Sequence, residues 1–399
     1  MKVLQINTVY GISSTGRTTK ELHEALQEKG IESIVAVTKT NTEGESLYFI
    51  GNKFDWKLHG LLSRIFGTQG YFSFFSTKKL LKYINKEKPD VIHLRNLHGN
   101  YINVPSLLKY ISKEQIPTVI TLHDCWFFTG KCCYFTDSNC DRWQRECGNC
   151  PALKKWNKSW FFDRSRKMLL DKKKYFSKIK NLAVIGVSNW VTDLAEQSIL
   201  KDAKVVKRIY NWIDLAVCKP TESNIRTELN LDSDFVVLGV AQRWNQLKGL
   251  NIFIDAAKAL PEYKFVMVGN MPKDIELPSN IISVGVVNKV EELVKYYSMA
   301  DVFLNPSVQE TFGKTTAEAI CCGTPVIGYN LTATPELIGE KCGLIIDENI
   351  ESVIRAINQI KEKGKQSFST DCLDFALNNF SKEFLINEYI NVYNDIVKQ

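Results

Sequence analysis

Two successive series of short apolar runs, separated by stretches with helical periodicity, constrain the fold of this chain most strongly. In the first half the runs cover residues 2–7, 33–37, 90–94, 118–122 and 182–187. A loop with Gly11 and Gly16 follows the first run, and a helix is predicted from about Thr18 to Lys29. In the second half the runs cover residues 235–240, 265–268, 281–284, 302–304, 325–328 and 343–346. Short apolar strands that alternate with helices are typical of parallel sheets covered on both faces. The sequence therefore predicts an α/β fold with two doubly wound, Rossmann-like domains.

The two series meet within residues 210–220. We expect one domain over residues 1–210 and a second over 211–379, with a last amphipathic helix over 380–399 that packs back on the first domain. A chain of 399 residues with 44% apolar composition is long enough for two such cores.

The amino end enters its first strand directly, without the apolar core of a signal peptide. No stretch reaches the roughly 18 to 20 apolar residues of a membrane-spanning helix. We therefore expect a cytoplasmic protein that is at most peripheral at the inner face of a membrane.

Charge is distributed unevenly along the chain. Residues 1–210 contain 34 Lys/Arg and 19 Asp/Glu, whereas residues 211–399 contain 17 and 25. Residues 154–174 alone hold nine basic and two acidic residues, interleaved with Trp156, Trp160, Phe161 and Phe162. This segment is either a solvated helical face or a patch that rests on an anionic membrane surface. Nucleic acid is not an expected partner, because no known binding module accompanies the charge.

Polar side chains follow two strands of the first series. His93, Asn96 and His98 accompany one strand end, and His123 with Asp124 follows the next strand. In open parallel sheets, the carboxyl edge is where ligands bind. These residues are therefore candidates for a site.

The strongest chemical signal lies in residues 307–319, where Glu310 and Glu318 flank a turn at Gly313. A helix that starts near Gly313 would place Glu318 up to ~12 Å along the axis, so that one carboxylate reaches a sugar and the other a ribose. The N–H groups at the helix start would face a diphosphate. The alternative is a surface helix with two unrelated glutamates.

This segment, with Gly323-Thr324-Pro325-Val326 after it, resembles the E-x7-E motif of family 4 retaining glycosyltransferases. The segment from Arg243 to Lys248-Gly249 resembles the family's Arg…Lys-Gly loop. Further similarity covers nearly the whole chain: Val187-Ser188-Asn189, Asn211-Trp212-Ile213-Asp214 and the amino-terminal glycine loop. Trp212 stands where Gly is usual, and Thr15-Gly16 where many members have Gly-Gly. The resemblance implies the GT-B fold, with two domains facing a cleft.

The resemblance also implies roles for individual residues. Arg243 and Lys248 would clamp the donor diphosphate, and the other donor-binding residues would be Gly16, Thr311, Phe312, Gly313 and Glu318. His123 would line the reaction centre, and Glu310 would support an oxocarbenium-like centre. Asn96 and His98 would bind the acceptor. No catalytic metal is expected, since protein cations replace it.

The predicted activity is retaining transfer of a hexose from a UDP- or GDP-sugar to a saccharide or polyprenyl-diphosphate-linked acceptor, in surface polysaccharide biosynthesis. Enzymatic alternatives are a GT-B nucleotide-sugar epimerase and a soluble sucrose- or glycogen-type synthase. A zinc-stabilised nucleic-acid-binding module is the non-enzymatic alternative.

Close cysteine spacing in a protein without a secretion signal points to metal or redox chemistry. Cys132, Cys140, Cys147 and Cys150 supply four thiolates, the last two in a C-x2-C knuckle, and predict a tetrahedral structural zinc. Similar inserts follow the His-Asp pair in a bacterial, colanic-acid-type branch of the family, often with His at the position of Cys133. Cys133 is therefore an alternative to Cys132, and free buried thiols are the alternative to a metal.

Overall fold

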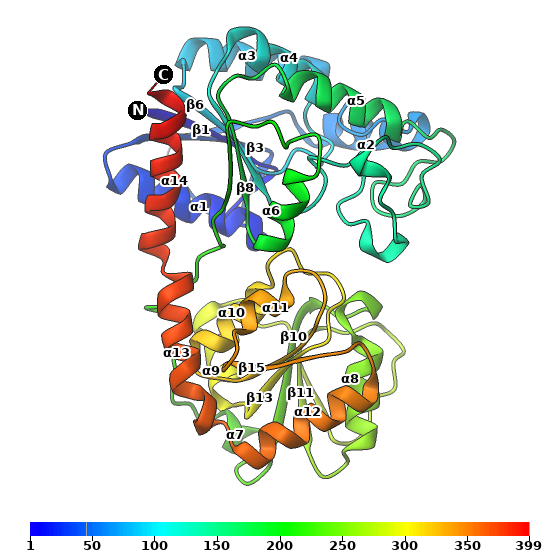
Figure 1. Ribbon diagram of the computed structural model, residues 1–399, viewed down its shortest axis with the longest axis vertical. Coiled ribbons are helices and arrows are strands. Elements are labelled where there is room, and N and C mark those ends of the chain that lie inside the picture. Colours follow the sequence, from blue (N-terminus) through cyan, green and yellow to red (C-terminus); the bar gives the residue numbers. More distant parts are fainter. Residues whose placement is uncertain (45, 399) are drawn as a thin grey trace. The chain divides into compact units, whose positions relative to one another are not determined.

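The computed structural model describes residues 1–44 and 46–398 and divides into two compact units. Unit 1 comprises Met1–Ile209 and Ile386–Gln399, and unit 2 comprises Tyr210–Leu385. Each unit is built on one parallel sheet with helices on both faces (Figure 1). The predicted α/β class with two doubly wound domains is confirmed.

The sheet of unit 1 has seven parallel strands in the order β5-β3-β1-β6-β7-β8-β9. Its strands are β1 (Lys2–Ile6), β3 (Glu32–Val37), β5 (Leu47–Phe49), β6 (Val91–Leu94), β7 (Thr118–Leu122), β8 (Leu182–Gly186) and β9 (Val205–Arg208). Every residue of β6, β7 and β8 is buried, as expected where helices cover both faces of a parallel sheet. A small pair, β2 (Val9–Tyr10) and β4 (Lys39–Thr40), lies outside this sheet.

Seven helices accompany this sheet within the described residues: α1 (Ser13–Glu28), α2 (Lys53–Phe66), α3 (Phe74–Glu87), α4 (Val104–Glu114), α5 (Ser165–Phe176), α6 (Asn189–Glu196) and the carboxyl-terminal part of α14 (Lys382–Val397). The hydroxyl of Tyr393 on α14 bonds His93 Nδ1 on β6 over 2.8 Å, and His93 Nε2 bonds Thr121 Oγ1 on β7 over 2.7 Å. These buried bonds fix the last helix to the centre of the sheet.

One expectation for this unit was wrong. The first helix was expected to begin near residue 18, with Gly16 in the preceding loop, but α1 already begins at Ser13. A Cβ on Gly16 would lie 3.0 Å from Val9 Cγ2, so the glycine lets the first turn of α1 pack closely on β2. Gly16 is therefore a helical residue.

The sheet of unit 2 has six parallel strands in the order β12-β11-β10-β13-β14-β15. They are β10 (Val236–Arg243), β11 (Lys264–Asn270), β12 (Ile281–Gly285), β13 (Val302–Asn305), β14 (Val326–Tyr329) and β15 (Gly343–Ile346). The helices are α7 (Ile225–Glu228), α8 (Leu250–Ala259), α9 (Val290–Met299), α10 (Lys314–Cys321), α11 (Thr334–Ile338), α12 (Ile350–Lys363) and α13 (Gln366–Phe380). Helices α8 and α12 pack together, and α10 packs against α9, α11 and α13 (Figure 1).

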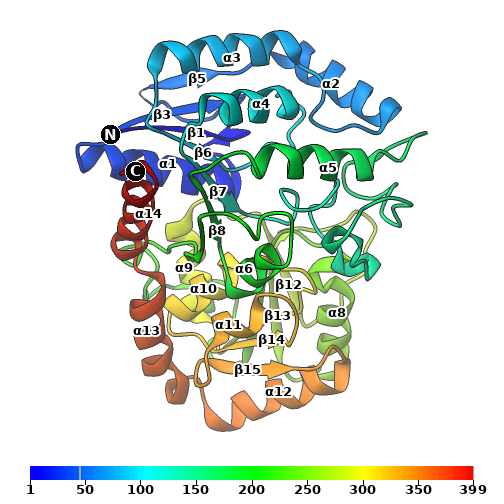
Figure 2. The same ribbon diagram turned by 45° about the horizontal axis from the view of Figure 1, so that its top comes forward.

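The cysteine-rich segment of unit 1 lies between β7 and α5. Over these roughly forty residues the chain forms only two short 3-10 helices, η1 (Thr136–Ser138) and η2 (Arg142–Gln144), among turns and bends. The segment is held instead by aromatic packing, with Trp143 buried between Phe128 and Phe135. Figure 2 shows this segment beside α5.

Candidate active site

Two loops of unit 2 are bonded to each other beyond the carboxyl ends of β10 and β13. One carries the short 3-10 helix η3 (Gln246–Lys248), and the other runs over residues 306–313. The Val308 N–H donates to the Leu247 carbonyl over 3.1 Å. A Cβ on Gly249, which has φ +70°, would lie 2.3 Å from the Pro306 carbonyl oxygen. Glycine is therefore required for this close approach.

This approach brings Lys248 against Glu310. Lys248 Nζ lies 2.5 Å from Glu310 Oε1 and 3.5 Å from Ser307 Oγ, and the two paired side chains are 37% and 13% exposed. The backbone of Glu310 is anchored as well, because its N–H donates to Thr332 Oγ1 over 3.1 Å and its carbonyl accepts from the Ala333 N–H. A partly exposed ion pair adds little to stability. Its value is the placement of a cation at the loop surface.

Helix α10 begins directly after these loops. It starts at Lys314, as the sequence predicted, and its N-cap Gly313 has φ +90° and makes no side-chain capping bond. The first N–H groups of a helix have no partner within the helix, and the helix dipole favours an anion there. Phe312 is buried against Tyr210 and Phe380, at centroid distances of 5.7 and 5.9 Å, and fixes the turn from inside.

The remaining predicted donor residues of unit 2 differ in exposure. Arg243 is the exposed last residue of β10, and Thr311 is buried beside Phe312. Glu318 lies inside α10 with only 3% exposure, and its carboxylate accepts a bond from Tyr297 OH over 3.0 Å. The two glutamates of the motif thus lie in different surroundings, one at a loop surface and the other in a core.

In unit 1, His123 follows β7 and contacts a buried arginine. Arg95 Nη2 lies 3.1 Å from His123 Nε2, and the same nitrogen donates to Thr18 Oγ1 over 2.9 Å. Arginine can only donate, so Nε2 accepts and the ring proton is on Nδ1. Burial and then the Arg95 charge lower the pKa of His123 to about 3. His123 is therefore a neutral imidazole near pH 7.

The neighbouring His98 is in the opposite state. Its Nε2 lies 2.7 Å from Asp124 Oδ2 and 3.8 Å from Cys133 Sγ. Burial opposes a charged ring, but Cys133 and Asp124 together hold the pKa of His98 well above its usual value. Because burial raises the pKa of the Cys133 thiol, we take the Asp124 carboxylate as the anion in contact. Two adjacent histidines with opposite charge states can perform different tasks in one site.

The other residues predicted for this unit have structural contacts. The Asn96 side chain accepts from Thr8 Oγ1 over 3.0 Å, and its backbone carbonyl accepts from Tyr101 OH over 2.6 Å. Gly16 is buried in the first turn of α1. The four predicted zinc ligands, Cys132, Cys140, Cys147 and Cys150, line one small cavity.

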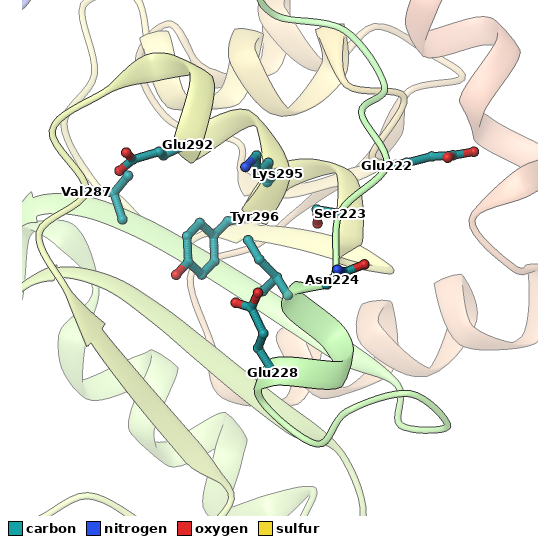
Figure 3. Close-up of a pocket in the computed structure, with 9 residues that line it drawn as sticks. Glu222, Ser223, Asn224, Glu228, Val287, Glu292, Lys295 and Tyr296 are labelled. Atoms are coloured by element: carbon teal, nitrogen blue, oxygen red, sulfur yellow. The ribbon is translucent and has the colours of Figure 1, made fainter.

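A large pocket of unit 2 contains none of these residues. It measures about 520 Å³ and opens between α7 and α9 of unit 2. Figure 3 shows its lining, which includes Glu228, Glu292 and Tyr296. None of the predicted donor residues lines it, so cavity size does not identify the candidate site.

Comparison with known families identifies the family of this chain. The family model Glycosyltransferase Family 4 matches residues 15–217, and the model Glycosyl transferases group 1 matches residues 221–370. The chain belongs to glycosyltransferase family 4. The protein is therefore a glycosyltransferase.

Curated relatives of this family 4 chain are distant. It is 24% identical over 324 residues to an uncharacterized 41.2 kDa protein in the cps region of Klebsiella pneumoniae, covering 79% of this chain and 81% of the relative. It is 22% identical to the putative colanic acid biosynthesis glycosyl transferase WcaC of Escherichia coli K12, covering 77% of each chain.

Solved structures show the fold of this family 4 member. Sucrose-phosphate synthase from Thermosynechococcus elongatus has a TM-score of 0.70 at 17% identity, covering 99% of both chains. HepE from Anabaena, solved in complex with UDP and glucose, has a TM-score of 0.67 at 16% identity, covering 99% of this chain and 100% of its own. These similarities show the predicted GT-B fold.

Sequence reasoning gave no role to one residue that contacts the candidate His123. Arg95 is 2% exposed and contacts His123 directly, yet it received no role from the sequence. The sequence did contain an indication of this role, because a cation directly after the buried β6 strand faces the same carboxyl edge as His123.

No helix in residues 1–44 and 46–398 is long and apolar enough to cross a membrane.

Proposed function

We propose that the protein transfers a hexose from a nucleoside diphosphate sugar to a saccharide or polyprenyl-diphosphate-linked acceptor, with retention at the anomeric carbon. The observation that carries the proposal is the Lys248–Glu310 pair beside the uncapped start of α10. The cation and the helix N–H groups suit a departing diphosphate. The carboxylate suits a sugar on which positive charge develops.

The donor diphosphate would be bound by unit 2. Lys248 has the exposure to reach a phosphate oxygen while it stays near Glu310, and Arg243 at the end of β10 adds a second cation. Cations fixed before the reaction stabilise the negative charge that grows on the leaving group. In this proposal protein cations do the work of a catalytic metal.

Unit 1 would contribute His123 to the transferred sugar. A neutral ring with its proton on Nδ1 is a hydrogen-bond donor that adds no positive charge beside an oxocarbenium-like centre. Arg95 acts through His123 as a positioning residue, since it holds Nε2 as an acceptor. We propose that Asn96 and His98 bind the acceptor, and that Gly16, Thr311, Phe312, Gly313 and Glu318 complete the donor site.

The named activities of relatives support the donor and the pathway. HepE was solved with UDP and glucose, which favours a UDP-sugar over a GDP-sugar. WcaC is named for colanic acid biosynthesis, and WclY of Escherichia coli, 28% identical over 202 residues, for O-antigen biosynthesis. We therefore place the reaction in the synthesis of a surface polysaccharide.

The acceptor's location is supported by an exposed apolar surface on unit 1. Phe54, Leu58 and Leu61 are exposed at helical spacing along α2. The Trp160 N–H donates to the Arg64 carbonyl over 2.7 Å, which joins the exposed residues Trp160, Phe161 and Phe162 to the end of α2. We call these six apolar residues the α2 surface. Figure 2 shows α2 and α5 on the same side of unit 1.

Basic residues surround the α2 surface. Lys53, Lys57 and Arg64 lie on α2, and eight of the nine basic residues of segment 154–174 are exposed. Lys172 is the exception: it is buried, lies 3.8 Å from the Trp126 ring centroid and donates to the Thr129 carbonyl. Exposed aromatic rings among Lys and Arg fit an anionic lipid surface. We propose that the protein rests there, at the inner face of a membrane, where lipid-linked acceptors lie.

The activity test compares Lys248→Ala and Glu310→Gln with Lys258→Ala, an exposed lysine on α8. Both site variants should lose about 10²- to 10³-fold in kcat with unchanged thermal unfolding, whereas the control keeps full activity. Wild-type activity in both site variants would contradict the assigned roles. Labelled donor without acceptor serves as a second control, because release of a changed nucleotide sugar would indicate an epimerase.

The membrane test is co-sedimentation with phosphatidylglycerol and phosphatidylcholine vesicles. The wild type should bind the anionic vesicles, and more weakly in high salt. The double variant Phe54→Ser/Phe161→Ser should bind ~10-fold more weakly, since the loss of each ring removes apolar surface from the interface. Phe384→Ser, at an exposed phenylalanine of unit 2, is the control. Equal binding by all three proteins would refute the surface.

A further inference from the structure

We propose that Cys132, Cys140, Cys147 and Cys150 bind a structural zinc ion that folds the cysteine-rich segment of unit 1. The four side chains come from three turns of the segment and line the same small cavity, together with Thr129, Phe135 and Trp143. Four cysteines around one cavity are the ligand set of a closed, tetrahedral zinc site. This proposal does not depend on the transferase chemistry.

The geometry of the knuckle favours a metal over four unrelated thiols. The Cys132 thiol is hydrogen-bonded to Cys150, so one pair of sulfurs is already in contact. Backbone N–H groups also donate to two of the sulfurs, Ala152 to Cys150 and Gly130 to Cys147. Gly148, between the last two cysteines, has φ +136° and lets the knuckle turn.

Charge around the cavity gives an independent reason. Lys131 and Lys172 are only 2% and 4% exposed, and both lie near these cysteines. Lys131 Nζ donates to the Leu153 carbonyl and Lys172 Nζ to the Thr129 carbonyl, so neither ammonium is hydrogen-bonded there to a carboxylate. Zinc with four thiolates carries two negative charges. Burial lowers the pKa of both lysines, that of Lys172 to about 7, and a nearby site with net negative charge would favour their ammonium forms.

The single carboxylate of the knuckle has a separate task. Asp163 Oδ2 accepts from the Cys150 N–H over 2.7 Å, and Oδ1 accepts from the Ser165 N–H over 2.9 Å. It therefore orients the backbone of the knuckle and connects it to the start of α5. A carboxylate that holds the backbone of a ligand residue is a common support for a metal site.

Apart from its aromatic packing, the segment has little regular structure. Between β7 and α5 it forms only η1 and η2 as regular structure, and its polar turns surround a few aromatic rings. Zinc bound by four thiolates stabilises folded zinc-finger peptides by ~10 kcal/mol or more. That is enough to hold a segment whose own core is this small.

A second group of possible ligands makes the proposal testable. His98, Asp124 and Cys133 have ligand atoms within 4.8 Å of one another, the one such group among the described residues. The four cysteine sulfurs do not meet that distance, so zinc binding would require them to move closer together. In the His98 group, the 2.7 Å His–Asp bond already satisfies both partners. It also offers only three ligands, one of them an imidazole that is held protonated.

The experiment measures zinc per chain by mass spectrometry of the full-length protein, expressed with zinc and purified without chelators. We expect one zinc in the wild type and in Cys133→Ser. Cys140→Ser and Cys147→Ser should retain zinc at least ~10-fold more weakly against a competing chelator. Cobalt in place of zinc should give the visible spectrum of a tetrahedral tetrathiolate site. UDP binding should persist in all variants, which separates this result from the proposed function.

Three outcomes would overturn the proposal. The first is a wild-type chain without zinc. The second is zinc that survives Cys147→Ser but is lost in Cys133→Ser, which would place the metal at His98. The third is a Cys132–Cys150 disulfide in the protein purified under reducing conditions. If the serine variants do not fold, mercurial titration of the wild type still decides, because zinc should be released as four thiols react.

Discussion

The two units share one architecture but place their polar residues differently. Unit 2 keeps its cationic candidates near the surface, since Lys248 is 37% exposed and Arg243 is the exposed last residue of β10, while Glu318 is buried. Unit 1 buries several polar groups, since Arg95, His93 and Lys172 are each at most 4% exposed, while its candidates His98 and His123 are half-buried. Surface cations can turn toward an incoming anion at little cost. Buried groups have fixed protonation states, and their positions depend on the whole core.

All five histidines of the chain lie in unit 1, and none lies within residues 210–385. His59 illustrates the consequence. Its Nε2 accepts from the Gly70 N–H over 3.2 Å, and burial lowers the pKa of the ring to about 4. The same acceptor role occurs at His123 with Arg95. The comparison therefore predicts that acid acts on unit 1 before it acts on unit 2.

The largest expected effect concerns the close loop contact of unit 2. Gly249→Ala should lower the free energy of unfolding of unit 2 by about 2 to 4 kcal/mol and abolish UDP binding, because the new Cβ meets Pro306 at a positive φ. Gly285→Ala is the control, since it has φ +73° and nothing within 4 Å. It should cost only about 1 to 2 kcal/mol. Equal costs in denaturant unfolding would show that the contact with Pro306 is not rigid.

The second largest expected effect is that acid destabilises unit 1 before it destabilises unit 2. A ring whose pKa is lower in the folded state than the unfolded value near 6.5 binds fewer protons when folded. The contribution of such a ring to the free energy of unfolding is complete above pH 6.5 and falls by up to about 1.4 kcal/mol per pH unit below it. His59, His93 and His123 act in this direction, while His98, with a raised pKa, opposes them.

Hydrogen exchange from pH 7.5 to pH 5 measures this difference, after correction for the intrinsic exchange rate. Amides of α2 near His59 should exchange faster at pH 5, while β10 and β13 of unit 2 stay protected. His59→Gln keeps an acceptor for the Gly70 N–H but does not titrate, so it should remove the response in α2. Faster exchange in unit 2 at the same pH would break the comparison.

Removal of single hydroxyl groups should have the smallest effects on the free energy of unfolding. The cost should be larger in unit 2 than in unit 1. Tyr297→Phe in unit 2 removes a donor from the buried Glu318 carboxylate and should cost about 1.5 to 3 kcal/mol. Tyr393→Phe in unit 1 removes a partner from a neutral ring and should cost about 1 kcal/mol. Calorimetry checks the order. A raised KM for the donor in Tyr297→Phe would support a ribose contact by Glu318.

The sequence predicted both sheets because buried parallel strands leave a strong local signal. The predicted runs at residues 118–122 and 343–346 coincide with β7 and β15. It missed β5 and β9, whose residues are only partly buried or exposed. It placed the start of α10 near Gly313 correctly, but started α1 too late, since Gly16 reads locally as a loop residue and its packing on Val9 is a tertiary contact.

By itself the sequence determined the fold class, the two-domain order, the family motifs and the set of cysteines, because each depends on residue type and spacing along the chain. The tertiary structure alone decided that Lys248 meets Glu310, that Glu318 is buried against Tyr297, and that burial together with Arg95 keeps His123 neutral. These contacts join residues between 21 and 62 positions apart in the sequence. Protonation and exposure depend on which distant side chains the fold brings together, and no local pattern records that.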